Sequence, residues 1–373
     1  MTPNFTISLK TEIVFGPGRV TDLLAHIPKG THVLLVRGAS GVPSAPVAEL
    51  LKDTDLTEVS CPTEPNATDL ADLLADLRPQ KIDLVVACGG GSVMDLGKAL
   101  AALLPSNDPL EAYLDGKTPT APVSCITIPT TAGTGAEVTR NAVIGLPEKG
   151  AKFSLRGPAF TPSLAIVDPN LMRSAPPRVI LGAGLDAVTQ MVEAYTSNAA
   201  NAFTDNLSWP GIDRGLSALK SLMQGDETAW PAMAWTATAS GIALSHGGLG
   251  VAHGLASIIG GRFDAPHGEL CGRLIGPVLS VNASAPQVTK AARSRVDACI
   301  AMFLQHFPTE SENTLAGFSD WCAKHELPYL RDWGVGKDSH ESIANAAMTA
   351  SSSLKNPVAL EAEQFRLVLS AAQ

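Results

Sequence analysis

The 373-residue sequence predicts an α/β domain, built on a parallel sheet with helices on both faces, followed by an all-α domain. In the first half, short apolar and β-branched runs alternate with stretches of helical spacing, which is typical of parallel strands joined by crossover helices. After Asp168 and Pro169, long stretches of helical spacing dominate. We therefore expect domains at residues 1–170 and 171–373.

The apolar runs of the first domain predict strands at residues 11–15, 31–36, 82–87 and 123–128. Helices are expected at residues 19–26, 47–52, 67–77 and 91–103. Asn66 or Thr68 suits the N-cap of the third helix. In the second domain, helices are expected at residues 184–197, 206–224, 233–246, 286–307, 315–325 and 340–352.

Composition narrows the functional class. A hydrophobic content of 45% with 17% charged residues is typical of a globular protein with a large core. The net charge of −9 argues against nucleic acid or an anionic membrane as partner. Six cysteines without C-x-x-C spacing favour free thiols in a reducing compartment. Because residues 1–5 lack a signal pattern and no apolar run is long enough to span a membrane, we expect a cytoplasmic protein.

Two glycine-containing loops follow predicted strands. Gly89, Gly90, Gly91 and Ser92 open the helix at 91–103, where backbone N–H groups can approach a pyrophosphate. The second loop, residues 129–137, follows the next strand. The first spacing is not G-x-G-x-x-G, and a tight strand–helix turn would use the same glycines. Two such loops after parallel strands favour nucleotide binding.

A set of possible metal ligands lies in the second half. Asp186 and Gln190 are four residues apart and so share one helix face, while His253 and His267 are separated by turn-forming residues. Oxygen and imidazole ligands suit Fe²⁺ or Zn²⁺. The residue types alone leave open that these histidines are hydrogen-bonded core residues.

The motifs together resemble the iron-containing (group III) alcohol dehydrogenase family over nearly the whole chain. They are G-G-G-S-x-x-D-x-x-K at residues 89–98, P-T-T-A-G-T-G-A-E at 129–137, G-x-D-A-x-x-Q at 184–190, H-G-x-A at 253–256 and P-H-G at 266–268. The resemblance implies a dehydroquinate synthase-like fold and an NAD(P)-dependent alcohol dehydrogenase or aldehyde reductase. Hydride would pass between a nicotinamide and an alcohol or carbonyl held on a divalent metal in the interdomain cleft. A small-molecule alcohol or aldehyde substrate and a homodimer are expected.

The resemblance also implies roles for individual residues. The metal ligands would be Asp186, Gln190, His253 and His267, with Gln190 standing where most members have histidine. Phosphate contacts would come from Gly89, Gly90, Gly91 and Ser92, and base or ribose contacts from Thr130, Thr131 and Thr134. Asp95 and Lys152 would lie near the nicotinamide ribose, although Lys152 could equally be a surface lysine.

Cofactor choice depends on the end of the strand at 31–36. NAD-dependent relatives often carry an aspartate there for the ribose 2′-hydroxyl, whereas this chain has Arg37 and Gly38. Gly38 offers no carboxylate to repel a 2′-phosphate, and Arg37 could attract one unless it points to solvent. NADP(H) is therefore permitted alongside NAD(H).

The proton-transfer residue is less clearly marked. Many relatives carry a histidine four residues after the H-G-x-A histidine, a position that is Ser257 here. His246 and His267 are the candidates for catalysis, with a structural role at a helix end as the alternative for His246. The proton could also leave through the cofactor ribose and water. A bound metal would lower the pKa of the alcohol.

Other functions remain open. A maleylacetate reductase-type enzyme would reduce an unsaturated oxo acid without metal; Gln190 favours it and Asp186 opposes it. A dehydroquinate synthase or glycerol phosphate dehydrogenase would need more basic phosphate ligands than the sequence offers. A non-catalytic binding protein would not need both glycine loops and a ligand set.

Overall fold

The computed structural model describes residues 4–311 and 315–373. The chain divides into two compact units: Ser8–Pro176, and Pro177–Gln373 with the described residues before Ser8. Residues 1–3, part of the segment in which no signal pattern was found, lie outside the described residues.

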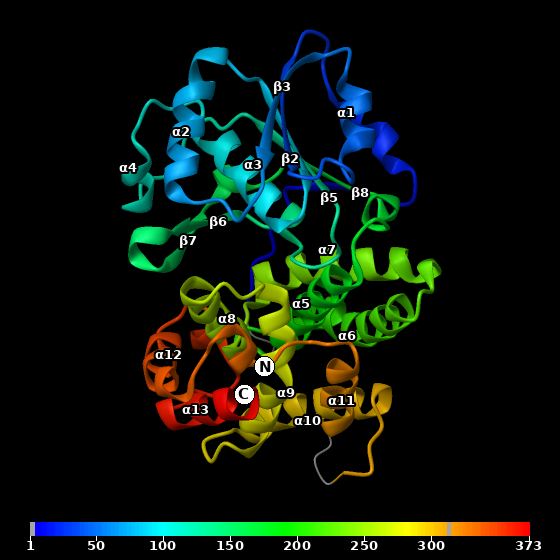
Figure 1. Ribbon diagram of the computed structural model, residues 1–373, viewed down its shortest axis with the longest axis vertical. Coiled ribbons are helices and arrows are strands. Elements are labelled where there is room, and N and C mark those ends of the chain that lie inside the picture. The colour runs from blue at the N-terminus through cyan, green and yellow to red at the C-terminus, as the bar shows by residue number, and fades with distance from the viewer. Residues whose placement is uncertain (1–3, 312–314) are drawn as a thin grey trace. The chain divides into compact units, whose positions relative to one another are not determined.

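The first unit contains a six-stranded parallel sheet with strand order β1-β8-β5-β4-β2-β3 (Figure 1). The strands are β1 (Glu12–Phe15), β2 (His32–Gly38), β3 (Asp55–Cys61), β4 (Leu84–Gly89), β5 (Ser124–Pro129) and β8 (Leu164–Val167). The predicted parallel sheet is confirmed. The sequence reading overlooked β3 and β8, because β3 is an edge strand with few buried residues and many polar ones, and β8 is only four residues long.

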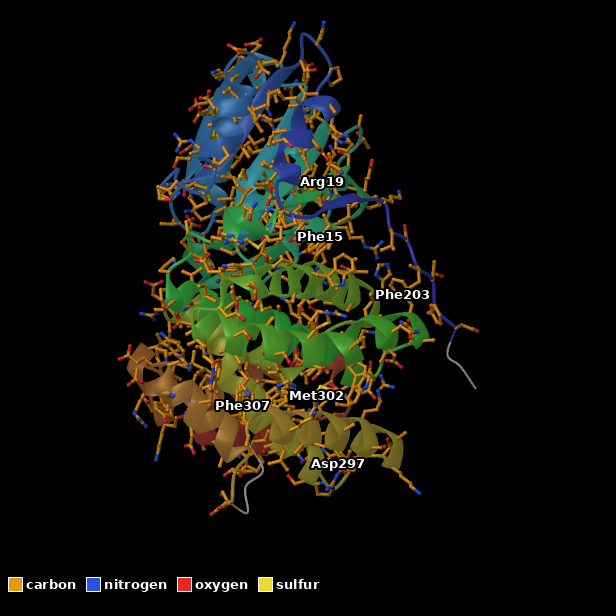
Figure 2. All side chains as sticks on the ribbon, turned by 90° about the vertical axis from the view of Figure 1, so that its right-hand side faces the viewer. Phe15, Arg19, Phe203, Asp297, Met302 and Phe307 are labelled. Carbon is orange, nitrogen blue, oxygen red and sulfur yellow. The ribbon has the colours of Figure 1, made fainter. Side chains whose placement is uncertain are left out.

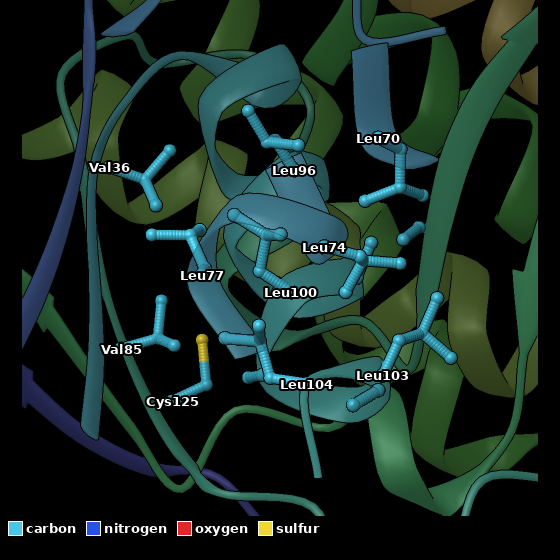
Figure 3. Close-up of a cluster of buried hydrophobic side chains, with 14 of the residues drawn as sticks. Val36, Leu70, Leu74, Leu77, Val85, Leu96, Leu100, Leu103, Leu104 and Cys125 are labelled. Atoms are coloured by element: carbon cyan, nitrogen blue, oxygen red, sulfur yellow. The ribbon is translucent and has the colours of Figure 1, made fainter. Parts of the chain in front are cut away.

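Helices cover both faces of this sheet. On one face, α2 (Ala67–Leu77) and α3 (Gly91–Leu103) join the sheet in one buried apolar cluster that includes Leu77, Leu100 and Val85 (Figure 3). On the other face, α1 (Ala45–Leu51) and the 3₁₀ helix η1 (Arg19–His26) pack against the sheet through buried apolar residues. The expected helix at residues 19–26 is thus a 3₁₀ helix. Asn66 caps α2 by accepting from the Asp69 N–H.

An antiparallel hairpin stands apart from the main sheet. It consists of β6 (Asn141–Leu146) and β7 (Ala151–Arg156), and short helix α4 (Leu110–Leu114) contacts β7. The sequence reading placed no strands in this region, since its apolar alternation is broken by Gly145, Pro147 and Gly150. The hairpin matters for the site because β6 packs on α3.

The second unit contains helices and no strands among its described residues, as predicted (Figure 1). Its helices are α5 (Pro177–Thr196), α6 (Ala202–Met223), α7 (Trp230–Gly247), α8 (Val251–Arg262), α9 (His267–Ser284), α10 (Lys290–His306), α11 (Ala316–Lys324), α12 (His340–Met348) and α13 (Ala362–Ala371). Helix α5 contacts α6, α7 and α9 and lies at the centre of the unit.

Several helix boundaries differ from those predicted. Helix α5 begins at Pro177 rather than residue 184, and Pro177 suits a first helical position because it lacks an N–H. Helix α10 begins at Lys290 because the Thr289 hydroxyl accepts from the Ala292 N–H and caps it. Figure 2 shows Asp297, Met302 and Phe307 following one another along and just beyond α10.

No single described helix has both the length and the hydropathy of a membrane span. The segments 227–247 and 251–262 reach those values only as a pair, and they meet at a bend of 103°.

Candidate functional site

Three side chains of the predicted metal set meet in the helical unit. Asp186 comes from the middle of α5, His253 from the first turn of α8 and His267 from the first residue of α9. Asp186 Oδ1 lies 3.3 Å from His253 Nε2 and 4.0 Å from His267 Nε2. The two imidazole ring centroids are 5.4 Å apart. Residues up to 81 positions apart in the chain therefore aim their polar atoms at one point.

Two of these polar atoms are buried without a hydrogen-bond partner. Asp186 Oδ1 and His253 Nε2 are both inaccessible to solvent, and neither makes a hydrogen bond within the described residues. The two atoms face each other at 3.3 Å as an ion pair, without the geometry of a hydrogen bond. A tetrahedral ion with bonds of about 2.0–2.1 Å separates its ligand atoms by roughly 3.3 Å, which is the spacing of this pair. The donor set therefore fits a divalent metal ion.

The ionisation of the pair follows from its surroundings. Burial by itself raises the pKa of Asp186, but the imidazoles of His253 and His267 outweigh burial and lower it. Burial by itself lowers the pKa of His253, yet Cys271 and the carboxylates of Glu193 and Asp186 raise it well above its ordinary value. The raised pKa favours a proton on His253 between the two carboxylates. A metal bound there would replace that proton.

Glu193 holds His253 in place, and the sequence reading did not find it. Its Oε2 lies 2.6 Å from His253 Nδ1, and its Oε1 accepts from the Ala252 N–H at 2.7 Å. A carboxylate on the second ring nitrogen sets the tautomer and orientation of a metal-binding histidine. Asp186 and Glu193 are seven residues apart and so share a face of α5, a spacing that could have revealed the pair.

Cys271 is the second residue that the sequence reading missed. Its Sγ lies 3.6 Å from His267 Nε2, and ligand atoms of Asp186, His253, His267 and Cys271 all lie within 4.8 Å of one another. Burial raises the pKa of the Cys271 thiol to about 12. The signal in the sequence is its position four residues after His267 on α9.

Gln190 and His246 have different surroundings. Gln190 is buried one turn after Asp186 on α5, and its Oε1 accepts a 2.5 Å hydrogen bond from Ser240 on α7. His246 lies in the last turn of α7, where its Nδ1 is 2.9 Å from the carbonyl of Ile242 and its ring contacts Phe203. His246 is not part of the group of His, Cys, Asp and Glu that the described residues gather within 4.8 Å.

Glycines allow the helices to approach closely enough to form this site. A Cβ on Gly268 would lie 2.3 Å from the carbonyl oxygen of Gly182 and 3.2 Å from the Asp186 Cβ. Only glycine therefore lets the start of α9 lie against α5. His267 is adjacent to this crossing, which brings its imidazole next to Asp186.

The two glycine loops of the first unit lie side by side. A Cβ added to Gly90 would lie 3.5 Å from Thr131 Oγ1, and one added to Gly91 would lie 2.8 Å from Thr134 Cγ2. The Thr130 N–H donates to the carbonyl of Gly89. The N-cap of α3 is Gly90, which has no side chain to accept a hydrogen bond from the N–H groups of the first turn. Ser92 belongs to this turn. Such a helix end suits a phosphate.

Ion pairs surround the other predicted cofactor residues. Asp95 pairs with the fully buried Lys98 at 2.9 Å, and Lys98 Nζ also donates to the Ala136 carbonyl and Thr139. Lys152 pairs with Glu64 at 2.5 Å. Burial raises the pKa of Asp95 above its ordinary value, with Lys98 opposing. Lys98 therefore ties α3 to the second loop, and Lys152 is an ion-paired rather than a plain surface lysine.

The end of β2 differs from expectation in one respect. Arg37 donates from Nε to Glu58 Oε2 at 2.6 Å, so its guanidinium is paired with a carboxylate of β3 and does not simply point to solvent. A side chain on Gly38 would meet nothing within 4 Å. The position therefore has room for a phosphate, while Arg37 is engaged by Glu58.

Family models match both parts of the chain. The iron-containing alcohol dehydrogenase model matches residues 10–169, and the model for the C-terminal part of the Fe-containing alcohol dehydrogenase family matches residues 180–373. Because the two matches together span nearly all of the sequence, they cover both the glycine loops and the ligand cluster.

Relatives of similar length support the same assignment. Alcohol dehydrogenase 4 of Saccharomyces cerevisiae is 30% identical over 87% of this chain and 86% of its own length. Lactaldehyde reductase of Escherichia coli is 32% identical over 76% of this chain and 75% of its own. The crystal structure of a 1,3-propanediol oxidoreductase superposes over the whole of both chains with a TM-score of 0.86 and 26% identity.

The family implies the use of a metal and of NAD(P), which agrees with a ligand cluster in one unit and paired glycine loops in the other. With family models over both halves and relatives that act on alcohols and aldehydes, this chain belongs to the iron-containing alcohol dehydrogenase family and is an oxidoreductase acting on alcohol groups.

Proposed function

We propose that the enzyme interconverts small alcohols and their carbonyl products with NAD(P)(H) and one divalent metal, held by Asp186, His253 and His267. The observation that carries this proposal is that Asp186 Oδ1 and His253 Nε2 are buried without a hydrogen bond and converge with His267. An ion between them would satisfy both atoms.

The metal would act as a Lewis acid on the alcohol or carbonyl oxygen while the nicotinamide accepts or supplies the hydride. Glu193 fixes the imidazole of His253 so that Nε2 faces the cluster. The side chains of Asp186 and His253 are buried, whereas that of His267 is 33% exposed, so the substrate approaches on the side of His267. His267 is thus the stronger catalytic candidate, because His246 already faces a backbone carbonyl.

The test of the metal site is elemental analysis after loading with Fe²⁺ or Zn²⁺ and gel filtration. His267→Ala should lose most of the bound metal. His306→Ala is the matched control, since it removes another histidine paired with a carboxylate, Asp213. Equal metal in the His267 variant and the unmodified protein would refute the site.

Adding a chelator to the metal-loaded enzyme distinguishes the proposed alcohol dehydrogenase from a maleylacetate reductase-type enzyme. Gln190, whose amide oxygen already accepts from Ser240, is the observation in its favour. That reaction needs no metal, so NAD(P)H oxidation with an unsaturated oxo acid should survive a chelator. We expect instead chelator-sensitive NAD(P)H turnover with aldehydes, and a screen of short aldehydes and alcohols by absorbance identifies the substrate.

For the cofactor, we propose that Gly89, Gly90, Gly91 and Ser92 bind the pyrophosphate, with Thr130, Thr131 and Thr134 beside them. Asp95 and Lys152 are proposed to face the nicotinamide ribose. The contact between the two loops supports this arrangement, since both then lie at the carboxyl ends of adjacent parallel strands, β4 and β5.

NADP(H) is proposed to bind at least as well as NAD(H), because Gly38 leaves room and adds no negative charge. Gly38→Asp should shift the preference towards NADH. Glu58→Gln should shift it towards NADPH by releasing Arg37, since a charge-assisted contact is worth roughly 1.5–3 kcal/mol, or about ten- to a hundredfold. Fluorescence titration of both cofactors decides this, and a clear NADH preference in the unmodified protein would contradict it.

The remaining proposals concern partners and place. Alcohol or aldehyde substrates fit the activities for which the relatives are named. A homodimer without nucleic acid or membrane partners is proposed, and light scattering tests it. All six cysteines are free and buried, which supports a cytoplasmic location because free thiols are kept reduced there.

A further inference from the structure

The fourth atom of the cluster is a sulfur. Cys271 is fully buried on α9, one turn after His267 and on the same helix face. Its Sγ lies 3.6 Å from His267 Nε2 and within 4.8 Å of the ligand atoms of Asp186 and His253. Among the described residues, no other cysteine belongs to such a group.

The amide of Gln190 is poorly placed to be the fourth ligand. It is neutral, and the oxygen through which an amide binds a cation already accepts the 2.5 Å hydrogen bond from Ser240. The chain thus has no imidazole at position 190 of α5. It carries instead the Cys271 sulfur on α9, which lies in the same cluster.

We propose that the Cys271 thiolate is the fourth protein ligand of the metal, in place of a ligand at Gln190. This inference rests on the metal site of the proposed function. On binding, the S–H bond breaks, its proton passes to solvent, and a sulfur–metal bond forms with no change of oxidation state. With one negative charge on each of Asp186 and Cys271 and two neutral histidines, a divalent ion balances the charge of its four ligands, and the Glu193 carboxylate lies behind His253. Thiolate favours Zn²⁺, Fe²⁺ or Co²⁺ over Mg²⁺ or Mn²⁺.

The proposal is tested by spectroscopy on the full chain loaded with Zn²⁺ or Co²⁺. X-ray absorption at the zinc edge should show one sulfur at about 2.3 Å beside nitrogen and oxygen neighbours. The Co²⁺ protein should show a near-ultraviolet sulfur-to-cobalt charge-transfer band. Both signals should vanish in Cys271→Ala and Cys271→Ser and persist in Cys299→Ala, which removes an equally buried thiol from α10.

A second arm asks whether sulfur replaces the missing imidazole. Cys271→Ala should retain metal about ten- to a hundredfold less tightly against a chelator. Adding Gln190→His should restore retention without a sulfur neighbour. If the double variant retains metal no better than Cys271→Ala, the exchange of ligands is overturned.

The unmodified protein gives the decisive outcome without relying on any variant. Metal bound at one equivalent with only nitrogen and oxygen neighbours overturns the Cys271 ligand while leaving the proposed function standing. If the unmodified protein binds no metal, or if His267→Ala binds it equally well, the metal site itself fails and the ligand proposal with it.

Discussion

The Glu193 carboxylate holds His253, one of the proposed metal ligands. Its two oxygens bond the His253 ring and the Ala252 N–H, so it orients both the imidazole and the first turn of α8. Loss of the Glu193 charge would lower the basicity of the His253 ring. It would also remove the constraint on the tautomer of that ring. Glu193 is thus a positioning residue of the proposed metal site.

Glu193→Gln should weaken metal binding about ten- to a hundredfold and leave the secondary structure unchanged. Competition with a chelating dye measures the dissociation constant. Glu49→Gln is the control, since it removes an exposed carboxylate that pairs only with Lys52. Equal affinity in both variants would show that Glu193 does not support the site.

Asp108, in the first unit, forms a contact that depends on pH. Lys117 and Ser106 hydrogen-bond its carboxylate and, with Tyr113, lower its pKa to about 2. A carboxylate with a lowered folded pKa stabilises the fold above its ordinary value of 3.8, and this contribution is lost as pH falls towards 2. Lys117→Ala should bring the pKa back towards 3.8, which NMR titration of the carboxyl carbon measures. An unchanged pKa would mean that Lys117 does not contribute.

The crossing of α5 and α9 depends on Gly268, where any side chain would overlap the backbone of Gly182. Backbone atoms cannot rotate away, so Gly268→Ala must push the helices apart, at a cost of roughly 1–3 kcal/mol. The displacement separates His267 from Asp186. We expect thermal unfolding at a lower temperature together with weaker metal retention.

Gly276→Ala is the matched control on the same helix. Its new Cβ would lie 3.7 Å from Phe318, an ordinary contact. Alanine is favoured over glycine inside a helix by up to about 1 kcal/mol, so this variant should be as stable as the unmodified protein or more so. Equal losses of metal in the two variants would show that the crossing has no special role.

The two units are predicted to respond to different ligands. When Zn²⁺ is added, amide hydrogen exchange with solvent should slow in α5, α8 and α9. When NADPH is added, it should slow in the loops after β4 and β5. At a hundredfold excess over the dissociation constant, a ligand adds about 2.7 kcal/mol to the stability of the state that binds it. Mass spectrometry of peptides reads both effects. Zn²⁺ protection confined to the first unit would contradict the assignment.

The local pattern of residues determined much about this protein. Apolar runs that alternate with segments of helical spacing indicate a parallel sheet, and the helical segments after them indicate a helical domain. A strand buried on both faces gives a continuous apolar run, whereas a helix buried on one face gives apolar residues at helical spacing. The glycines after β4, and Asp186 with its two histidines, were visible as motifs. Edge strand β3 was not, since it has many polar residues, and hairpin β6–β7 was not, since glycine and proline interrupt its apolar pattern.

Only the tertiary structure decided which side chains meet. Glu193 and Cys271 look like ordinary helix residues until α5, α8 and α9 cross, and Arg37 looks available until β3 brings Glu58 beside it. The physical reason is that ligand and ion-pair geometry depends on contacts between residues far apart in the chain. Spacing along one helix constrains a single face, whereas the approach of two helices depends on the packing of the whole unit.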